Sequence, residues 1–395
     1  MGGEVVTEVL VRSFLLSWFG LGFAGLASAC GPASEAVDPP AVGGGSGAQG
    51  GTGPASQGGT NTAGTNAAGG SSATGGRSGA AGGRSSTSGG AATAGGNNTA
   101  GTLSTTKFVG NITTGDVADT NGMVFAKHWD QITPENAGKW GNVQANTGQN
   151  FNWSRLDQLY DYAQQNNLPF KQHTFVWGSQ QPGGNVDEAA VKRWMTEYCK
   201  RYPNTQMIDV VNEPPPHRGP SYANAIGGGT DSSWQWITNS FKWAREACPK
   251  AILILNDYNN IEWSTDHQHF LSIVLAVQAA GAPIDAIGAQ SHDLDNANVS
   301  AANVKKMLRN LNDQTGLPVY ISEFDISTTD DAAQLAAYQQ WIPYFLEQSY
   351  IPGITIWGWI YGRTWADAPN SGLIRNNSPR PAWTWLMQQL DRPER

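Results

Sequence analysis

The chain has 395 residues, enough for one large domain or two of ordinary size. Its formal net charge is −8, which argues against nucleic-acid binding, because proteins of that class carry a basic face. Of the 16 tryptophans, 15 follow residue 128, and such a surplus of flat, partly polar side chains suits a groove for flat ligands such as sugar rings.

The first 29 residues are predicted to be an export signal. Arg12 precedes an apolar run over residues 14–26, which is too short to span a bilayer comfortably, and Ala-Ser-Ala at 27–29 is typical of a cleavage site. Cys30 follows directly and resembles the lipid-modified cysteine of bacterial lipoproteins. We therefore expect an exported protein of a bacterium, either a cell-surface lipoprotein or a plainly secreted protein in which Cys30 is incidental.

Residues 30–103 are predicted to be a flexible low-complexity linker. Gly, Ser, Ala, Thr, Asn and Gln dominate the segment, and no aromatic residue occurs between Phe23 and Phe108. Such a composition cannot bury enough apolar surface to offset the entropy lost on ordering. The remaining residues, 104–395, are expected to form one catalytic domain of a size typical of an eightfold α/β barrel.

Short apolar runs alternate with amphipathic stretches of helical length along this domain. Strands are expected within residues 108–112, 130–136, 168–177, 207–211, 251–260, 284–293, 317–327 and 352–359, and helices over 152–167, 186–203, 232–249, 266–281, 300–316, 331–348 and 380–390. Alternation predicts a parallel sheet, and eight units predict closure into a (β/α)8 TIM barrel. A doubly wound open sheet is the alternative, but no Gly-rich phosphate loop follows the first strand.

Polar and aromatic side chains follow nearly every predicted strand. In strand order they are Glu135, Asn136, Lys139 and Trp140; His173 and Trp177; Asn212 and Glu213; Asn256, Asp257 and Tyr258; Gln290 and His292; Glu323 and Asp325; and Trp357. In a barrel these positions share one face, where the chemistry lies. Glu213 and Glu323 are expected on opposite sides of one mouth, as in glycosidic bond hydrolysis by two carboxyl groups. The three prolines after Glu213 should hold its loop stiffly.

Seven motifs carry a resemblance to a known family. "TPENAGKW", "HTFVW", "DVVNE", "NDYN", "QSH", "SEFDI" and "WGWIYGRTW" occur in the order found in family-10 glycoside hydrolases, the endo-β-1,4-xylanases, and the likeness covers residues 104–391. There are two departures. Gly178 stands where many relatives carry a second histidine, and the loop after Trp357 lacks the usual acidic residue.

The resemblance implies a role for each strand-end residue. Glu213 would be the general acid/base and Glu323 the nucleophile of a retaining reaction, with carboxyl groups about 5–5.5 Å apart. His292 would keep Glu323 ionised, and Asp325 would orient His292. The expected sugar contacts are Asn212 to the 2-hydroxyl, His173, Lys139, Trp177 and Gln290 around the central sugar, Glu135 and Asn136 on the next, Tyr258 on the leaving-group side, and Trp357 and Trp365 as walls. No metal or organic cofactor is required, the partners are xylan and xylo-oligosaccharides, and a monomer is expected.

Several alternatives stay open at this point. The enzyme could be a β-1,4-glucanase, or the protein could bind carbohydrate with an inactive site. Strand-end acids and histidines can be structural, and His173, His292 and a carboxylate could hold zinc, although no short-spaced histidine pair supports this. The His267-x-His269 pair is expected on an outward, solvated helix face. Trp140, Trp177, Trp357 and Trp365 could belong to the core, whereas Trp194, Trp234, Trp243 and Trp341 are expected to be packing residues.

Cys199 and Cys248 lie at the ends of the predicted helices that precede the fourth and fifth strands. Neighbouring helices of a barrel end side by side, and an exported protein can oxidise its thiols. We therefore predict a disulfide between these two residues.

Overall fold

The structure, a computed structural model, describes residues 107–228 and 232–394. The predicted export signal (1–29), Cys30 and the predicted linker (30–103) lie outside the described residues. No helix among the described residues is both long and apolar enough to cross a membrane.

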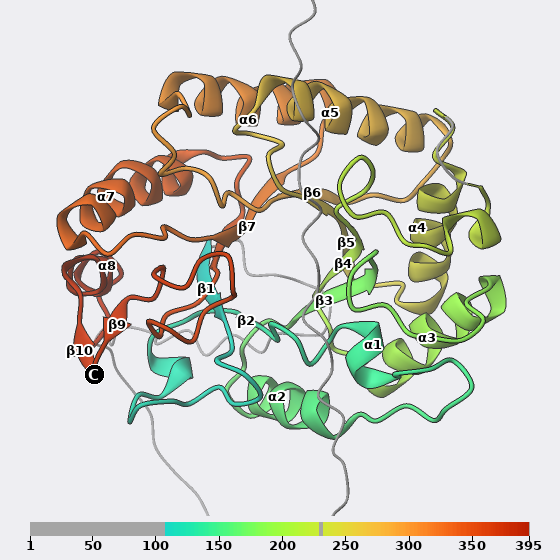
Figure 1. The fold of residues 1–395 in the computed structure, drawn as a ribbon, viewed down its shortest axis with the longest axis horizontal. Helices are drawn as coiled ribbons and strands as arrows, with labels where there is room; N and C mark the ends of the chain where they lie inside the picture. Colours follow the sequence, from blue (N-terminus) through green and yellow to red (C-terminus); the bar gives the residue numbers. More distant parts are fainter. Residues whose placement is uncertain (1–106, 229–231, 395) are drawn as a thin grey trace, which may run out of the picture. The chain divides into compact units, whose positions relative to one another are not determined.

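Eight parallel strands form a nearly closed barrel (Figure 1). They are β1 (Phe108–Ile112), β2 (Ile132–Thr133), β3 (Lys171–Val176), β4 (Met207–Asn212), β5 (Ile252–Asp257), β6 (Ala286–Ala289), β7 (Val319–Phe324) and β8 (Gly353–Ile356), hydrogen-bonded in the order β2-β1-β8-β7-β6-β5-β4-β3. A parallel bridge between Ile132 and Phe170 joins the two outer strands and closes the ring. The predicted (β/α)8 fold is confirmed, and the open doubly wound sheet is excluded.

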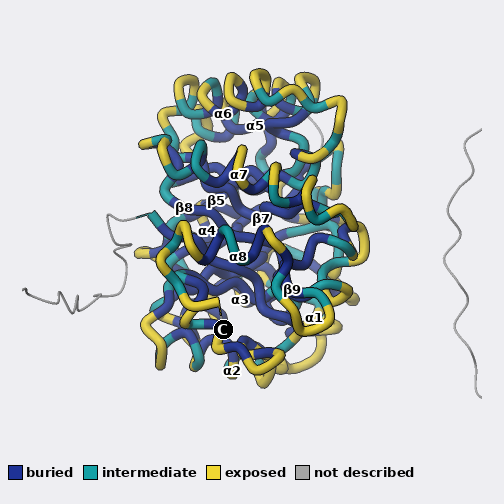
Figure 2. Tube along the Cα trace, turned by 90° about the vertical axis from the view of Figure 1, so that its left-hand side faces the viewer, coloured by how far each residue is buried: buried dark blue, intermediate teal, exposed yellow. Residues whose placement is uncertain are grey.

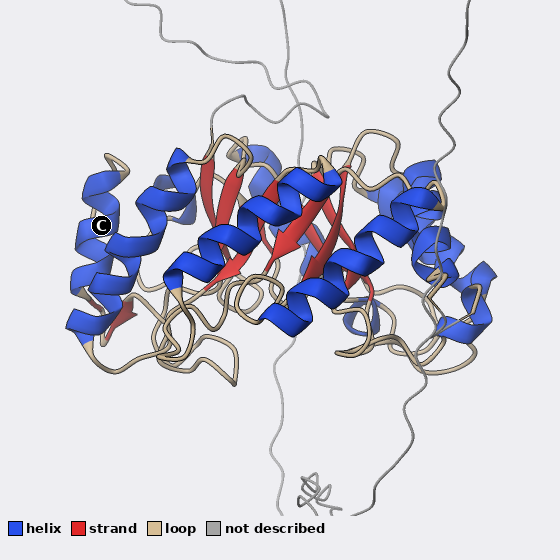
Figure 3. Ribbon diagram, turned by 90° about the horizontal axis from the view of Figure 1, so that it is seen from above, coloured by secondary structure: helices blue, strands red, loops and turns tan. Residues whose placement is uncertain are grey.

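Helices surround the strands, as seen from above in Figure 3. They are α2 (Ser154–Gln165), α3 (Glu188–Arg201), α4 (Gln235–Ala247), α5 (Ser264–Ala279), α6 (Ala301–Thr315), α7 (Asp331–Glu347) and α8 (Pro381–Gln389), and all seven were predicted. Short elements that were not predicted are α1 (Trp140–Val143), the 3-10 turns η1 (Phe125–Lys127) and η2 (Ala223–Ile226), and the small hairpin β9 (Ile374–Arg375) and β10 (Ser378–Pro379).

The hydrophobic pattern explains why these segments fold as they do. In α2 the buried residues are Leu156, Leu159, Tyr160 and Ala163, the spacing of one helical face. By contrast, β1, β3 and β4 are buried along their whole length, as expected for parallel strands covered on both sides. Figure 2 shows the result, a buried interior beneath helices whose outer faces are exposed.

The two ends of the barrel differ in chemistry. Phe108, Met207, Ile254, Ala286 and Tyr320 form a separate buried apolar cluster in the amino-terminal parts of their strands. The carboxyl ends carry the polar residues, so that the barrel is filled with apolar side chains at one end and open to chemistry at the other.

The sulfur atoms of Cys199, in α3, and Cys248, directly after α4, are bonded in the structure, with their Cα atoms 5.4 Å apart. The predicted pairing is therefore sterically satisfied, because this Cα separation lies within the range that disulfides require. Oxidation of the isolated protein stays a prediction.

The expectation of a solvated His267-x-His269 pair is wrong. His267 is buried, with Nδ1 2.9 Å from the Asn260 carbonyl oxygen and Nε2 2.8 Å from Asn310 Oδ1 on α6. His269 is half-buried, with Nε2 2.8 Å from the Pro215 carbonyl oxygen. Both residues face neighbouring segments because α5 packs against α6 and against the loop that follows β4.

Trp194, Trp234, Trp243 and Trp341 are buried packing residues, as predicted. Trp140 also belongs to the core, since its ring stacks on Trp194 at a centroid distance of 5.8 Å. The core alternative therefore holds for Trp140, whereas Trp177, Trp357 and Trp365 line the cavity described next.

Candidate active site

A cavity of about 610 Å³ lies at the carboxyl ends of the strands. Its walls include every predicted site residue except Asn212 and Asp325: Glu135, Asn136, Lys139, His173, Trp177, Glu213, Tyr258, Gln290, His292, Glu323, Trp357 and Trp365. The residues that were predicted at the strand ends therefore surround one cavity, as expected. Ser179, Gln180, Arg218, Asn259, Asp293, Ala366 and Asp367 also line the cavity and were not predicted.

Three strands of the sheet, β3, β4 and β7, have irregular pairing close to His173, Glu213 and Glu323. The pairing register shifts between His173 and Val176 in β3, between Asp209 and Val211 in β4, and between Ile321 and Phe324 in β7. Such bulges twist a strand locally and redirect its side chains. They lie beside the positions from which His173, Glu213 and Glu323 reach the cavity.

Glu213 is the first residue after β4, and its backbone turns sharply there. Its φ of 51° lies in the left-handed region, which a residue with a Cβ adopts at a cost of about 1–3 kcal/mol. Trp177 Nε1 donates to Oε2 at 2.8 Å, and Asn212 Nδ2 and Gln290 Nε2 donate to Oε1, each at 3.2 Å. The carboxyl group, 8% exposed, is thus fixed by three donors at the cavity wall.

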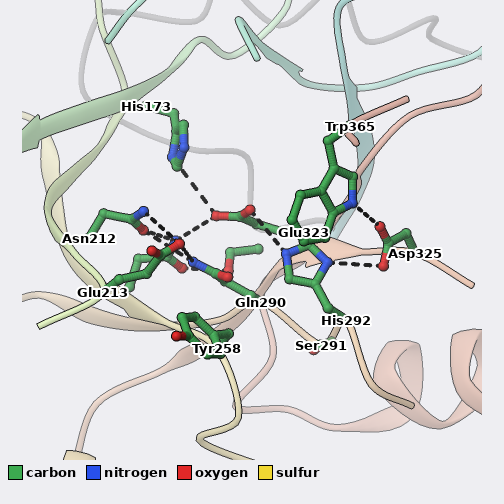
Figure 4. Close-up of polar contacts among 12 residues, drawn as sticks. His173, Asn212, Glu213, Tyr258, Gln290, Ser291, His292, Glu323, Asp325 and Trp365 are labelled. Atoms are coloured by element: carbon green, nitrogen blue, oxygen red, sulfur yellow. Dashed lines mark hydrogen bonds and ion pairs between the residues drawn. The ribbon is translucent and has the colours of Figure 1, made fainter. Parts of the chain in front are cut away.

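Glu323 lies in β7 and faces two histidines (Figure 4). Its Oε1 is 3.9 Å from His173 Nδ1, and its Oε2 is 3.4 Å from His292 Nε2. Burial by itself raises the pKa of Glu323, but the positive charges of His173, His292 and Lys171 outweigh it and lower the pKa to about 2. Glu323 is therefore ionised at neutral pH.

His292 is held between two carboxylates. Its Nδ1 is 2.9 Å from Asp325 Oδ1, and the other oxygen of Asp325 accepts a hydrogen bond from Trp365 Nε1 at 2.7 Å. Burial lowers the pKa of His292, yet the charges of Asp325 and Glu323 prevail and raise it well above the usual value. This geometry agrees with the expectation that Asp325 orients His292 and that His292 supports the charge of Glu323.

Two amides connect the glutamates. Asn256 Nδ2 donates to Glu323 Oε1 and to Asn212 Oδ1, each at 2.7 Å, and Asn212 in turn donates to Glu213. Ser322 Oγ donates to Asn256 Oδ1 at 2.5 Å and so fixes the amide orientation. Asn256 was predicted at a strand end but given no role, and its side chain sets the relative position of both carboxyl groups.

A buried ionic cluster below the cavity was missed from the sequence. Asp209, in the middle of β4, lies 2.9 Å from His173 Nδ1 and 3.3 Å from Lys171 Nζ. Lys171 Nζ also donates to the Ser322 carbonyl oxygen at 3.2 Å. The available signal was an acid inside the apolar run "MIDVV", because a buried carboxylate requires a partner.

One end of the cavity is built from the loop after β2. Lys139 Nζ donates to Asn136 Oδ1 at 2.9 Å and lies 4.9 Å from the centre of the Trp177 ring. Burial lowers the pKa of Lys139 and raises the pKa of Glu135. This end therefore presents a partly desolvated acid, a cation and an aromatic face, groups that can bind the hydroxyls and the ring of a sugar.

The other end contains Tyr258. The ring of His217 stacks on Tyr258 with centroids 3.8 Å apart, and His217 Nδ1 is 2.7 Å from Asp257 Oδ1. Burial raises the pKa of Asp257 to about 7, against the opposing effect of His217. His217 was not predicted, since nothing in the sequence shows that the loop after β4 returns to Tyr258.

Within the described ranges, no cluster of three or more His, Cys, Asp or Glu side chains is arranged to hold a metal ion. His173 and His292 instead lie on opposite oxygens of Glu323, and each also contacts an aspartate.

A (β/α)8 barrel with two carboxyl groups facing one cavity is an architecture that glycoside hydrolases use. The chain belongs to glycosyl hydrolase family 10, whose family model matches residues 95–389.

Two relatives of this chain carry the name of a xylanase. Endo-1,4-beta-xylanase B of Cellvibrio japonicus is 45% identical over 289 residues, which cover 71% of this chain and 45% of that protein. Endo-1,4-beta-xylanase 3 of Hypocrea jecorina is 29% identical over 284 residues, which cover 68% of this chain and 77% of that protein. The chain thus spans less than half the length of the Cellvibrio relative.

Solved structures share the fold. Xylanase 10B of Thermotoga petrophila RKU-1, determined in complex with xylobiose, superposes with a TM-score of 0.63 at 21% identity, covering 72% of this chain and 94% of that one.

Proposed function

We propose that the protein is an endo-β-1,4-xylanase, which hydrolyses internal β-1,4-xylosidic bonds of xylan. The observation that carries this proposal is that Glu213 and Glu323 face one cavity of a family-10 barrel and are joined through Asn212 and Asn256. The names of the relatives support xylan and its oligosaccharides as the substrates.

The reaction would proceed by double displacement with retention. Ionised Glu323 attacks the anomeric carbon while the protonated carboxyl of Glu213 gives its proton to the leaving oxygen, so that a glycosyl ester forms and the glycosidic bond breaks. Glu213, now ionised, takes a proton from water as the water attacks the same carbon and releases Glu323. The low pKa of Glu323 supports its role as the nucleophile.

The remaining side chains would hold the polysaccharide. Asn212 would contact the 2-hydroxyl, and the sugar on which cleavage occurs would lie among His173, Lys139, Trp177 and Gln290, with Glu135 and Asn136 on the next sugar. Trp357 and Trp365 would form the walls, and Tyr258 would stand on the leaving-group side. All of these except Asn212 line the cavity, which supports the assignment.

Hydrolysis of linear xylohexaose, followed by NMR of the newly formed anomers, tests the mechanism. The β-anomer should appear first, and Glu213→Gln should abolish turnover while oligosaccharide binding persists. Inverted products, or a Glu213→Gln variant as fast as the parent, would refute the assignment. A protein that binds but never cleaves would establish the carbohydrate-binding alternative.

A second comparison tests the choice of polysaccharide. Initial rates on xylan should exceed those on carboxymethyl-cellulose, because each glucose carries an extra hydroxymethyl group that must fit the inner sites. Equal or faster cleavage of the cellulose derivative would favour the β-1,4-glucanase alternative.

We also infer that a bacterium exports the protein and that Cys30 carries a lipid anchor, on the basis of the apolar run at 14–26 and the Ala-Ser-Ala that precedes Cys30. Expression with and without a Cys30→Ala substitution tests this. The parent should partition with membranes, whereas the variant should be released. Equal release of both would leave a plainly secreted protein.

A further inference from the structure

The loop at residues 214–219, directly after Glu213, packs against Gly178. Gly178 N donates to the Arg218 carbonyl oxygen at 2.8 Å. A Cβ added at Gly178 would lie 2.3 Å from that oxygen and 2.4 Å from the carbonyl oxygen of Gly219, closer than real contacts allow. The glycine that departs from the family pattern therefore leaves room for this loop.

The same loop is fixed on its other side. His217 stacks on Tyr258 and bonds Asp257, while the amide of Arg218 donates to the Glu213 carbonyl oxygen at 2.9 Å. Arg218 therefore lines the same cavity as Glu213 and Tyr258, and it belongs to the loop that contacts Tyr258 at the end assigned to the leaving group.

The guanidinium of Arg218 has donors to spare. Its side chain is 58% exposed, and Nε lies 3.6 Å from Glu213 Oε2, the one carboxylate within ion-pair distance of it among the described residues. A guanidinium has five N–H donors in a planar fork that matches a second carboxylate. When Glu213 carries its proton, the charge of Arg218 is left without an anionic partner in this part of the cavity.

The other basic groups that line the cavity already have partners. The lining includes the carboxyl groups of Glu135, Glu213, Asp293, Glu323 and Asp367 and the basic side chains of Lys139, His173, Arg218 and His292. His173 contacts Asp209, and His292 contacts both Asp325 and Glu323. Lys139 is buried and already engaged by Asn136 and the Trp177 ring. An acidic group on a substrate would therefore be attracted at Arg218 and disfavoured elsewhere.

We propose that Arg218 binds the carboxylate of a uronic acid substituent on xylan, on the leaving-group side of the cleaved bond. The inference rests on the proposed xylanase function and narrows its substrate class. It makes Arg218 a specificity-determining residue that favours acid-substituted xylan over a neutral chain of the same shape.

The test compares xylan that carries uronic acid side groups with the same material after chemical reduction of the carboxyl groups to alcohols. Reduction keeps the size of each substituent and removes its charge. The parent should cleave the acidic form with a kcat/KM about 2- to 5-fold higher at low ionic strength, the range expected for a partly exposed ion pair. Added salt should reduce the preference.

Arg218→Met should bring the ratio of the two kcat/KM values close to one, and Arg218→Lys should retain part of the preference. Taking the ratio within each variant removes any effect of Arg218 on Glu213 that is common to both substrates. Lys250→Met, which removes an exposed charge on the segment between α4 and β5, should keep the parental ratio.

A parent without the preference, or an Arg218→Met variant that keeps it, would overturn the inference. Failure of the proposed function would be seen separately, as intact linear xylohexaose after incubation with the parent. If the parent does not cleave xylohexaose, equilibrium binding of the acidic and the reduced xylan to the parent and to Arg218→Met is compared instead. Tighter binding of the acidic form by the parent, lost in Arg218→Met, would support the inference. A parent without that preference, or a variant that keeps it, would overturn the inference.

Discussion

At the scale of single residues, the charge state of Glu323 is set by the charged side chains around it. Burial alone would keep Glu323 protonated to a higher pH, and the two histidines and Lys171 reverse this effect. The folded pKa of about 2 is below the ordinary value of 4.5, so the ionised form of Glu323 stabilises the fold at pH values above 4.5. That contribution is lost as the pH falls from 4.5 towards 2.

Replacing His292 by asparagine should therefore shift the pH dependence of the enzyme. In the proposed reaction ionised Glu323 is the nucleophile, so kcat/KM should fall as the pH drops through the pKa of Glu323. Removal of one positive neighbour raises that pKa, and the acidic limb should move upward by about one unit or more. A pH profile of kcat/KM on a soluble xylo-oligosaccharide measures the shift, and an unmoved limb would contradict the role given to His292.

Sequence reasoning reached the residues that strands deliver directly. Glu213 and Glu323 were singled out because each is an acid at the end of an apolar run and because both fall within motifs of the family-10 pattern. The loop after β4 folds back over the cavity. Its path brings Arg218 within 3.6 Å of Glu213 and stacks the ring of His217 on Tyr258. A loop has no periodic sequence pattern from which its path could be predicted, so Arg218 and His217 were not predicted as site residues.

At the scale of secondary-structure elements, strands and helices were predictable because their apolar patterns have different periods. The predicted boundaries of the long elements agree with the structure to within a few residues, as in α6 (Ala301–Thr315). The elements that were not predicted are α1, η1, η2 and the β9–β10 hairpin, which are too short to show a period. His267 was misplaced because the helix-to-helix contact that buries it cannot be seen within a single helix.

Gly178→Ala tests the packing of the loop on β3. The added methyl group would overlap backbone oxygens, so the loop must move or the fold must strain, at a cost of about 1–3 kcal/mol. The melting temperature should fall by several degrees. Gly183→Ala is the matched control, since its nearest contact would be 3.5 Å and its stability should be unchanged. Equal melting temperatures for the two variants would show that the loop is not constrained there.

At the scale of the whole molecule, the disulfide connects residues 49 positions apart, and the loop between them contains β4, Glu213 and all of α4. Closing a loop of that length restricts the unfolded chain, and the chain-entropy model gives about 4 kcal/mol. Cys199→Ala with Cys248→Ala should lower the free energy of unfolding by about 2–5 kcal/mol in denaturant titration.

Mass spectrometry of the unreduced protein provides the control for this comparison. A mass two hydrogens below that of the reduced chain would establish the bond, whereas two free thiols would remove the basis for the expected stability loss.

The pairing between β2 and β3 is the weakest contact between neighbouring strands of the barrel. Within the described residues, β2 meets β3 through the Ile132–Phe170 bridge and the hydrogen bond from Ile132 N to the Pro169 carbonyl oxygen. Backbone amides beside this seam should take up deuterium before those of β5 to β7. Opening there would loosen the strand that holds His173 while the strand of Glu323 stays paired, so inactivation by gentle heating should precede global melting.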